Sequence, residues 1–214
     1  MKIAYRVQHA AGRDAPLERL LAVIGAAEVV TDQDASSDPN PLRNYRRCLS
    51  FTGNATHLVV LQDDVIACPD LLERVPRLVE ERPNEVISLF VGGLPSGTKR
   101  MFLKALRDGE RWSPVYFRDI HHVVALVWPV ALANEFLSFV DTQRLPGGTV
   151  PRSDDAAVGY WARNRKHTFW ATVPCLVEHP DDVPSTIRRR DRFGDPGRRA
   201  IAYIGDLDSD LPPR

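Results

Sequence analysis

The chain has 214 residues, with 28 Lys and Arg against 28 Asp and Glu, so its formal net charge at pH 7 is zero. A hydrophobic fraction of 43% and a charged fraction of 26% are typical of a soluble globular protein. The balanced charge argues against a protein that binds nucleic acid or an anionic membrane through bulk charge, because such proteins usually carry a large basic excess. A local basic patch stays possible.

The three cysteines, Cys48, Cys68 and Cys175, lie far apart and never in a CxxC spacing. Neither a disulfide framework nor a thiolate zinc site is indicated, so buried free thiols are expected. No signal peptide is apparent, and no apolar stretch reaches the roughly 18 residues that a membrane span needs. We therefore expect a cytoplasmic protein with no membrane partner.

Apolar runs of strand length alternate with segments of helical spacing through the first half of the chain. Strands are expected at residues 3–7, 28–31, 56–62 and 85–91, and helices at residues 16–26, 42–51 and 70–81. This alternation indicates a parallel α/β sheet. The segment at residues 32–41 is expected to be a loop, because it is rich in Asp, Ser, Asn and Pro.

The second half continues the pattern less regularly. We expect a Gly-rich loop at residues 92–100, a short helix at 101–108, one or two strands within 116–128, helices at 129–140 and 154–165, and last strands at 168–173 and 176–177. A Gly/Pro loop at residues 144–152 precedes Ser153, which is a good N-cap for the next helix. We predict one domain at residues 1–185, followed by an Arg/Asp-rich C-terminal tail at residues 186–214.

Adjacent carboxylates, Asp63 and Asp64, stand where the apolar run of residues 56–62 ends. In open α/β sheets this carboxyl edge is where ligands bind. The two acids repel each other unless a cation compensates them, and a hard divalent ion such as Mg2+ or Mn2+ is the natural candidate. The alternative is that one of them only caps the turn before the next helix.

Later segments of the chain carry further acidic and metal-binding side chains. Asp154 and Asp155 follow Ser153 at a helix start, where backbone N–H groups stabilise carboxylates even without a function. Glu178 and His179 end a late strand. A His beside carboxylates at a strand end is a plausible metal ligand, although a lone His is more often a surface or core residue.

The order of these motifs resembles the nucleotide-sugar glycosyltransferases of the GT-A fold, from the first strand through Ser185. THLVVLQDDV is similar to the strand leading to the family's DxD-type metal motif, and NYRRCLSFTGNATHLVVLQDD to the preceding helix that positions the donor. SDDAAVGYW resembles the acidic motif that opens the acceptor-side helix, and VPCLVEHPDDVPS the late strand whose His completes the metal shell. The chain departs from the family at Gln62, where many members carry an acid.

The resemblance implies a GT-A-like, Rossmann-type α/β fold with a mixed, mostly parallel sheet flanked by helices. It implies transfer of a sugar from a nucleoside diphosphate sugar, a UDP-sugar first of all, to an acceptor hydroxyl. Mn2+ or Mg2+ held by Asp64, Asp63 and His179 would stabilise the charge on the departing diphosphate. Asp155, or Asp154, would accept the proton of the acceptor, and a single base without a covalent intermediate implies inversion.

Donor-binding side chains are expected near the carboxyl ends of the first strands and on the helix at residues 42–51. The candidates are Gln8, His9, Arg13, Asp32, Asp34, Arg43, Arg47 and Gln62. An Asx-turn explains Asp32 equally well, and Arg43 and Arg47 could equally be solvated surface residues.

The acceptor side offers weaker signals. Lys99 and Arg100 are candidates if residues 92–100 form a lid over the acceptor, against the alternative of an ordinary surface connection. Of the tryptophans, Trp161 is the best candidate for stacking on a sugar, although core packing is the more common role for such a residue. The acceptor could be a glycan, a small molecule or a hydroxymethylated base in DNA. An arginine-rich run at residues 188–199 could touch an anionic acceptor, although a solvated charged tail is the ordinary interpretation.

Other functions fit the same residues. A metal-dependent nucleotidyltransferase or phosphoesterase also needs paired acids and a divalent ion at a sheet edge. A non-catalytic nucleotide-sugar-binding protein would keep the carboxylates only as caps. The sequence contains no Walker-type Gly-Lys loop, no GxGxxG after the first strand and no GxSxG, which argues against kinases, dinucleotide-binding enzymes and serine hydrolases.

Overall fold

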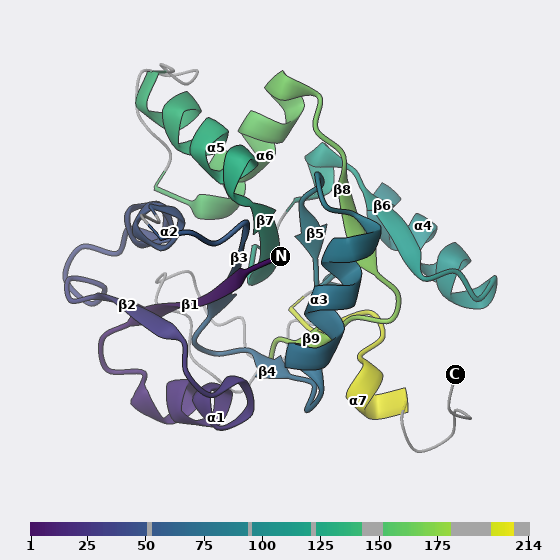
Figure 1. The fold of residues 1–214 in the computed structure, drawn as a ribbon, viewed down its shortest axis with the longest axis horizontal. Helices are drawn as coiled ribbons and strands as arrows, with labels where there is room; N and C mark the ends of the chain where they lie inside the picture. The colour runs from purple at the N-terminus through teal and green to yellow at the C-terminus, as the bar shows by residue number, and fades with distance from the viewer. Residues whose placement is uncertain (51–52, 94–95, 121–122, 143–151, 181–197, 208–214) are drawn as a thin grey trace.

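The structure is a computed structural model that describes residues 1–50, 53–93, 96–120, 123–142, 152–180 and 198–207. Its centre is a 7-stranded sheet (Figure 1). The strand order is β2 (Glu28–Asp32), β1 (Ile3–Ala10), β3 (His57–Gln62), β7 (Ala125–Pro129), β5 (Ile87–Ser88), β8 (Phe169–Thr172) and β6 (Trp112–Val115). Strands β7 and β6 run against the other strands. The predicted fold class, a mixed and mostly parallel α/β sheet flanked by helices, is confirmed.

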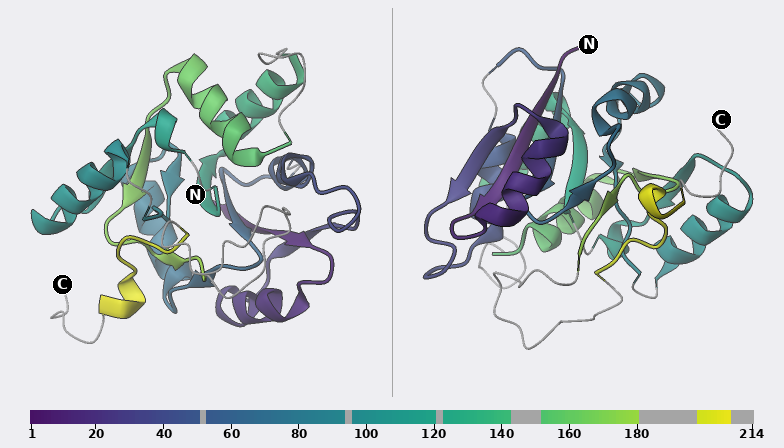
Figure 2. Two further views of the ribbon diagram at one scale, coloured as in Figure 1. Left: turned by 180° about the vertical axis from the view of Figure 1, so that it is seen from behind. Right: turned by 90° about the horizontal axis from the view of Figure 1, so that it is seen from below.

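Helices pack on both faces of this sheet. One face carries α1 (Asp14–Ile24) and α3 (Leu71–Glu81), and the other carries α2 (Pro41–Leu49), α4 (Gly97–Arg107), α5 (Val130–Thr142) and α6 (Asp154–Arg165). Successive side chains of β3 alternate between the two hydrophobic cores, because side chains of a strand point to opposite faces in turn. The views in Figure 2 show β2 and α1 at one end of the molecule and α4 at the other.

Polar side chains fix where several helices begin. Asn40 accepts a hydrogen bond from the Arg43 N–H at 3.0 Å, and Ser153 accepts one from the Ala156 N–H at 3.4 Å. Such caps satisfy backbone donors that the helix itself leaves without partners. The predicted N-cap at Ser153 is confirmed, and it sets the position of Asp154 and Asp155 in the first turn of α6.

Two expectations for the middle of the chain were wrong in part, and one strand there was not predicted. The strand expected at residues 85–91 is shorter, at Ile87–Ser88. The Leu89 N–H still donates to Ala125 of β7, but the carbonyls of Leu89 and Val91 accept from later segments of the chain. The loop expected at residues 92–100 ends early, because Ser96 caps α4 and starts that helix at Gly97. Strand β6 was not expected, because Ser113 and Pro114 interrupt its apolar pattern.

The late segments return to the carboxyl end of β3. Strand β4 (Ile66–Ala67) pairs with β9 (Val177–Glu178) in an antiparallel ribbon. Residues 198–207, which include α7 (Ile204–Leu207), pack beside them through a bridge between Gly92 and Ala200 and another between Cys175 and Tyr203. These pairings bring the end of β9 and the C-terminal segment next to the residues that follow β3.

The described helices include none with the length and hydropathy that a membrane span requires. All three cysteines are buried and unpaired by disulfides, as predicted. Burial raises the pKa of Cys48 and of Cys175 to about 12, which keeps both thiols protonated near neutral pH.

Candidate functional site

The carboxyl ends of β1 and β3 place Asp63 and Asp64 side by side in the interior. Their residues are 1% and 3% exposed. The Asp63 N–H donates to the Gln8 carbonyl at 3.1 Å, so the parallel pairing of the strands continues one residue beyond β3. Buried carboxylates are costly unless they are paired and hydrogen-bonded, and each one therefore has to be accounted for.

Asp63 is fully engaged by the protein. Its Oδ2 accepts a hydrogen bond from the Ala10 N–H at 2.8 Å and lies 2.9 Å from Nδ1 of His9, while its Oδ1 lies 2.9 Å from Nη1 of Arg13. Burial raises the pKa of Asp63, and the charge of Arg13 opposes that rise. Asp63 therefore holds Arg13 and His9 in place at the end of β1.

Arg13 supplies the first cation for the acidic pair. Its Nη2 lies 2.5 Å from Oδ2 of Asp64, so one guanidinium bridges both carboxylates. Its Nε is buried and has no partner among the described residues. The repulsion between Asp63 and Asp64, which suggested a metal ion from the sequence, is thus relieved in the protein itself by a residue predicted to bind the donor.

His179 and Arg198 complete the surroundings of Asp64. Nε2 of His179 lies 3.3 Å from Oδ2 of Asp64 and 3.2 Å from Nη2 of Arg198, while its Nδ1 lies 3.0 Å from the Pro180 carbonyl. A carboxylate only accepts hydrogen bonds and a guanidinium only donates them, so Nε2 cannot satisfy both neighbours at once. Burial raises the pKa of Asp64, but the hydrogen bond from His179 and the charge of Arg13 outweigh burial and hold the pKa below its usual range.

A second acidic group faces the same edge from α6. Asp154 is 3% exposed, and its Oδ2 accepts a hydrogen bond from Nε2 of Gln8 at 3.2 Å, while its Oδ1 accepts one from the Asp155 N–H at 3.0 Å. The Gln62 side chain also hydrogen-bonds Asp154. Burial raises the pKa of Asp154 against the lowering effect of these bonds. Gln8 and Gln62 therefore join the end of the sheet to the start of α6.

Asp155 differs from Asp154 in exposure. Its residue is partly exposed, and its Oδ1 accepts a hydrogen bond from the Val123 N–H at 2.7 Å. Of the two adjacent acids, Asp155 is thus the one that a molecule outside the protein can approach, while Asp154 is enclosed.

The predicted donor-binding residues after β2 form a cluster of their own. Asp32 is 5% exposed and accepts hydrogen bonds from Nη2 of Arg43 at 2.8 and 3.2 Å. It also accepts one from the Asp34 N–H at 3.3 Å, which is the Asx-turn alternative. Asp34 and Arg47 are exposed, and Arg47 donates to the Thr31 carbonyl at 3.0 Å.

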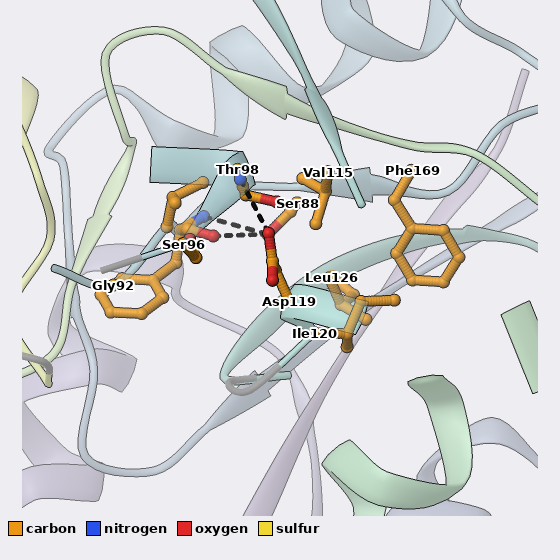
Figure 3. A pocket seen from close by; sticks show the side chains of 11 residues that line it. Ser88, Gly92, Ser96, Thr98, Val115, Asp119, Ile120, Leu126 and Phe169 are labelled. Atoms are coloured by element: carbon orange, nitrogen blue, oxygen red, sulfur yellow. Dashed lines mark hydrogen bonds between the residues drawn. The ribbon is translucent and has the colours of Figure 1, made fainter. Parts of the chain in front are cut away.

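The predicted acceptor residues Lys99 and Arg100 lie in the first turn of α4. Lys99 donates from Nζ to the Gly93 carbonyl at 2.7 Å, and Arg100 is exposed. Figure 3 shows the Asp119 carboxylate pointing at this helix start, where it accepts a hydrogen bond from the Thr98 N–H at 2.8 Å. A cavity of about 30 Å³ lies beside it. A capped helix, rather than a loop, therefore carries both residues.

Trp161 is not accessible to a sugar in this structure. Its side chain is 0% exposed and packs against Trp128, with ring centroids 5.3 Å apart. Its Nε1 donates to Glu135 at 3.2 Å. Trp161, about two turns into α6, therefore packs in the hydrophobic core, which is the alternative that the sequence left open, and it offers no platform for stacking on a sugar.

Two residues of this site, Glu178 and Arg198, were not among the metal-binding or donor-binding candidates predicted from the sequence. Oε1 of Glu178 accepts hydrogen bonds from the His179 N–H at 2.7 Å and the Ala200 N–H at 2.8 Å. Burial raises the pKa of Glu178, and these two bonds oppose the rise. The sequence indicated only that Arg198 belongs to an arginine-rich C-terminal tail that could touch an anionic acceptor, since no local pattern shows that its segment packs beside β9. Residues 188–192 of the arginine-rich run lie outside the described residues.

Comparisons with known proteins find solved structures that align at low identity. Neither the family models nor the curated proteins include a match to the sequence. A crystal structure of S. aureus TarS residues 1–349 aligns with 12% identity and a TM-score of 0.47, over 80% of this chain and 58% of that chain. TarS in complex with UDP-GlcNAc aligns with 12% identity and a TM-score of 0.40, over 63% and 47%. A197 from STIV aligns with 13% identity and a TM-score of 0.48, over 83% and 84%.

Proposed function

We propose that the protein is a glycosyltransferase that binds a nucleoside diphosphate sugar at the carboxyl ends of β1 and β3. The observation that carries this proposal is the meeting of Asp64, His179 and the Gln8–Asp154 pair at this edge, from segments far apart in the chain. Ligands of open α/β sheets bind at this edge. The resemblance of the motifs to those of GT-A glycosyltransferases supports the same function.

The donor atoms at Asp64 fit a divalent ion, Mn2+ or Mg2+, that takes much of its coordination from substrate. Oδ1 of Asp64 is buried and has no partner among the described residues. His179 lies with Nδ1 against a backbone carbonyl, as metal-binding histidines usually do. No group of three His, Cys, Asp or Glu side chains in the described part of the chain could hold an ion, so Asp64 and His179 would act together with phosphate oxygens and water.

Such an ion would stabilise the negative charge that the diphosphate gains as the glycosidic bond breaks. Asp63 would serve this site indirectly, because its oxygens are held by His9, Ala10 and Arg13. The predicted role of Asp63 as a second ligand is thus less well supported than the role of Asp64.

The proton of the acceptor hydroxyl would go to Asp155. A base must come within hydrogen-bond reach of the proton it takes, and Asp155 is partly exposed where Asp154 is enclosed. Asp154 would instead fix the start of α6 through Gln8 and Gln62. One base and no covalent intermediate would give inversion at the anomeric carbon.

A binding and turnover experiment tests the proposal. UDP-, GDP- and TDP-sugars are added to the protein with and without Mn2+, and the melting temperature and donor hydrolysis are measured. We expect one nucleotide class to raise the melting temperature more with Mn2+. Asp64→Asn should lose the metal-dependent part of the shift, and Asp155→Asn should keep donor binding and lose transfer.

The control is Asp141→Asn, an exposed carboxylate paired with Arg46 far from this edge. A protein that binds none of these donors would contradict the proposal. Release of phosphate or pyrophosphate from nucleotides without sugar transfer would favour a nucleotidyltransferase or phosphoesterase. Donor binding without any turnover would favour a non-catalytic nucleotide-sugar-binding protein.

A further inference from the structure

Arg198 is an almost buried arginine in a site otherwise built by residues that follow β1, β3 and β9. Its residue is 9% exposed, and its Nη2 lies 3.9 Å from Oδ2 of Asp64. Arg13 approaches the same oxygen from the N-terminal part of the chain. Guanidinium groups that come from opposite ends of the sequence therefore meet at one carboxylate oxygen.

Glu178 fixes the segment that carries Arg198. Its Oε1 accepts the N–H groups of His179 and Ala200, which ties the residue after β9 to the residue two positions beyond Arg198. The neighbouring side chain points the other way: Arg199 has 54% side-chain exposure and lies 3.7 Å from Oε2 of Glu178. The Gly93 N–H donates to the Arg199 carbonyl at 3.0 Å and secures the same register.

The cluster leaves polar atoms unsatisfied in a way that points to an anionic ligand. Nε of Arg13 is buried without a partner in the described part of the molecule, although buried donors are seldom left so. Nη2 of Arg198 lies 3.2 Å from Nε2 of His179 and 3.9 Å from Oδ2 of Asp64, so this donor has no close oxygen acceptor among the described residues.

The donors of the cluster suit such a ligand. Asp63 and Asp64 balance Arg13 and Arg198, so the attraction for a phosphate would come from individual N–H donors and not from net charge. Guanidinium groups bind phosphate oxygens through two parallel N–H donors, with strong charge-assisted hydrogen bonds. A diphosphate would thus find oriented donors here.

We propose that Arg13 and Arg198 form the subsite for the diphosphate of the donor, and that Glu178 positions Arg198. The C-terminal segment at residues 198–207 is then part of the donor site rather than a tail. This inference rests on the proposed function, because it assigns the diphosphate-binding part of the same site.

Calorimetric titration with UDP, GDP, TDP, the corresponding nucleosides and inorganic pyrophosphate tests the subsite. Arg198→Gln is expected to weaken binding of the nucleoside diphosphate and of pyrophosphate by about tenfold or more, because a charge-assisted hydrogen bond is lost. Binding of the nucleoside should change by less than about twofold, since it contacts no phosphate-binding group. Arg199→Gln, the matched control in the same segment, should leave the binding of all three kinds of ligand unchanged.

The same comparison of diphosphate binding with nucleoside binding tests Glu178 as a positioning residue. Glu178→Ala should weaken binding of the diphosphate and leave binding of the nucleoside unchanged, because it frees the segment that carries Arg198. Glu178→Gln should restore binding, since its amide oxygen can accept the same two N–H groups. If Arg198→Gln fails to fold, Arg198→Lys can be used instead, because it keeps the positive charge but lacks the two parallel N–H donors of a guanidinium. We expect an intermediate loss of diphosphate affinity for this variant.

The outcomes separate this inference from the proposed function. Wild-type protein that binds UDP while Arg198→Gln binds it equally well overturns the subsite and leaves the glycosyltransferase proposal standing. An equal loss of diphosphate affinity in Arg199→Gln also overturns the subsite, because a general effect of positive charge would then explain the results for both variants. Wild-type protein that binds pyrophosphate through Arg198 but no nucleotide supports the subsite and contradicts the proposed function.

Discussion

At the scale of single residues, Arg13 decides whether two adjacent carboxylates can be buried. Asp63 and Asp64 are both nearly inaccessible, and Arg13 contacts each of them. Removal of one partner from a buried ion pair is more damaging than replacement of the whole pair, because it leaves a buried charge without compensation. The arginine therefore has a structural role in the free protein besides the role proposed for it in donor binding.

Arg13→Gln is expected to lower the free energy of unfolding by about 3 kcal/mol at pH 7, since it leaves carboxylates uncompensated. Adding Asp64→Asn to that variant should recover part of the loss, because it removes one of those charges. Urea denaturation of the wild type, both single variants and the double variant gives the coupling energy. Strictly additive effects of the two substitutions would show that the contact in the structure is not energetically significant.

The lowered pKa of Asp64 also predicts how the free energy of unfolding changes at acidic pH. Because its pKa is held below the ordinary value of 3.8, its contribution to stability is present above that pH and is lost as the pH falls through the lower pKa of the folded state. Asp64→Asn should therefore be less stable than the wild type at pH 7, by about 1–3 kcal/mol. The difference between the two should shrink below about pH 4, as measured by urea denaturation at a series of pH values. A constant difference across that range would mean that Asp64 is not an ionised partner of Arg13 and His179.

At the scale of elements, the start of α6 links helix capping to the site. Ser153 caps the helix, Asp154 is hydrogen-bonded to Gln8 of β1, and Asp155 is hydrogen-bonded to the Val123 N–H. The first turn of α6 is therefore held by side chains on three sides. The cap was predictable from the sequence because Ser before two acids is a local signal, whereas the contact with Gln8 spans 146 positions and has no local signature.

Ser153→Ala is expected to lower the free energy of unfolding by about 1 kcal/mol, through loss of the N-cap. It should also lower transfer activity more than donor binding, because it loosens Asp155 without touching Asp64. Asn40→Ala provides the comparison, since Asn40 caps α2 in the same way at a helix that carries no proposed base. Equal effects of the two variants on transfer would show that the cap acts only on stability.

At the scale of the whole molecule, the sequence predicts the local helices and strands but not the contacts between segments far apart in the chain. The apolar run before Asp63 and the pattern of α6 were sufficient to place the sheet and the acidic residues. Trp161 was open to both core packing and sugar stacking, because helical position alone does not tell which face of α6 meets the core. Arg198 was not assigned to the site, because its position depends on the bridge between Ala200 and Gly92 and on the bond from the Ala200 N–H to Glu178, which have no local signature in the sequence.

Because residues from both ends of the chain meet at Asp64, ligand binding should stabilise both ends together. The Ala10 N–H is bonded to Asp63 and the Ala200 N–H to Glu178, so both bonds break when the site opens. Hydrogen exchange measured by mass spectrometry should slow in peptides covering residues 8–13 and 198–203 when the preferred nucleoside diphosphate is bound. Peptides covering residues 81–85 are the internal control, because Pro83 lies at the amino end of β3, where its carbonyl contacts His57. Protection of the N-terminal peptide alone would show that the C-terminal segment is not part of the donor site.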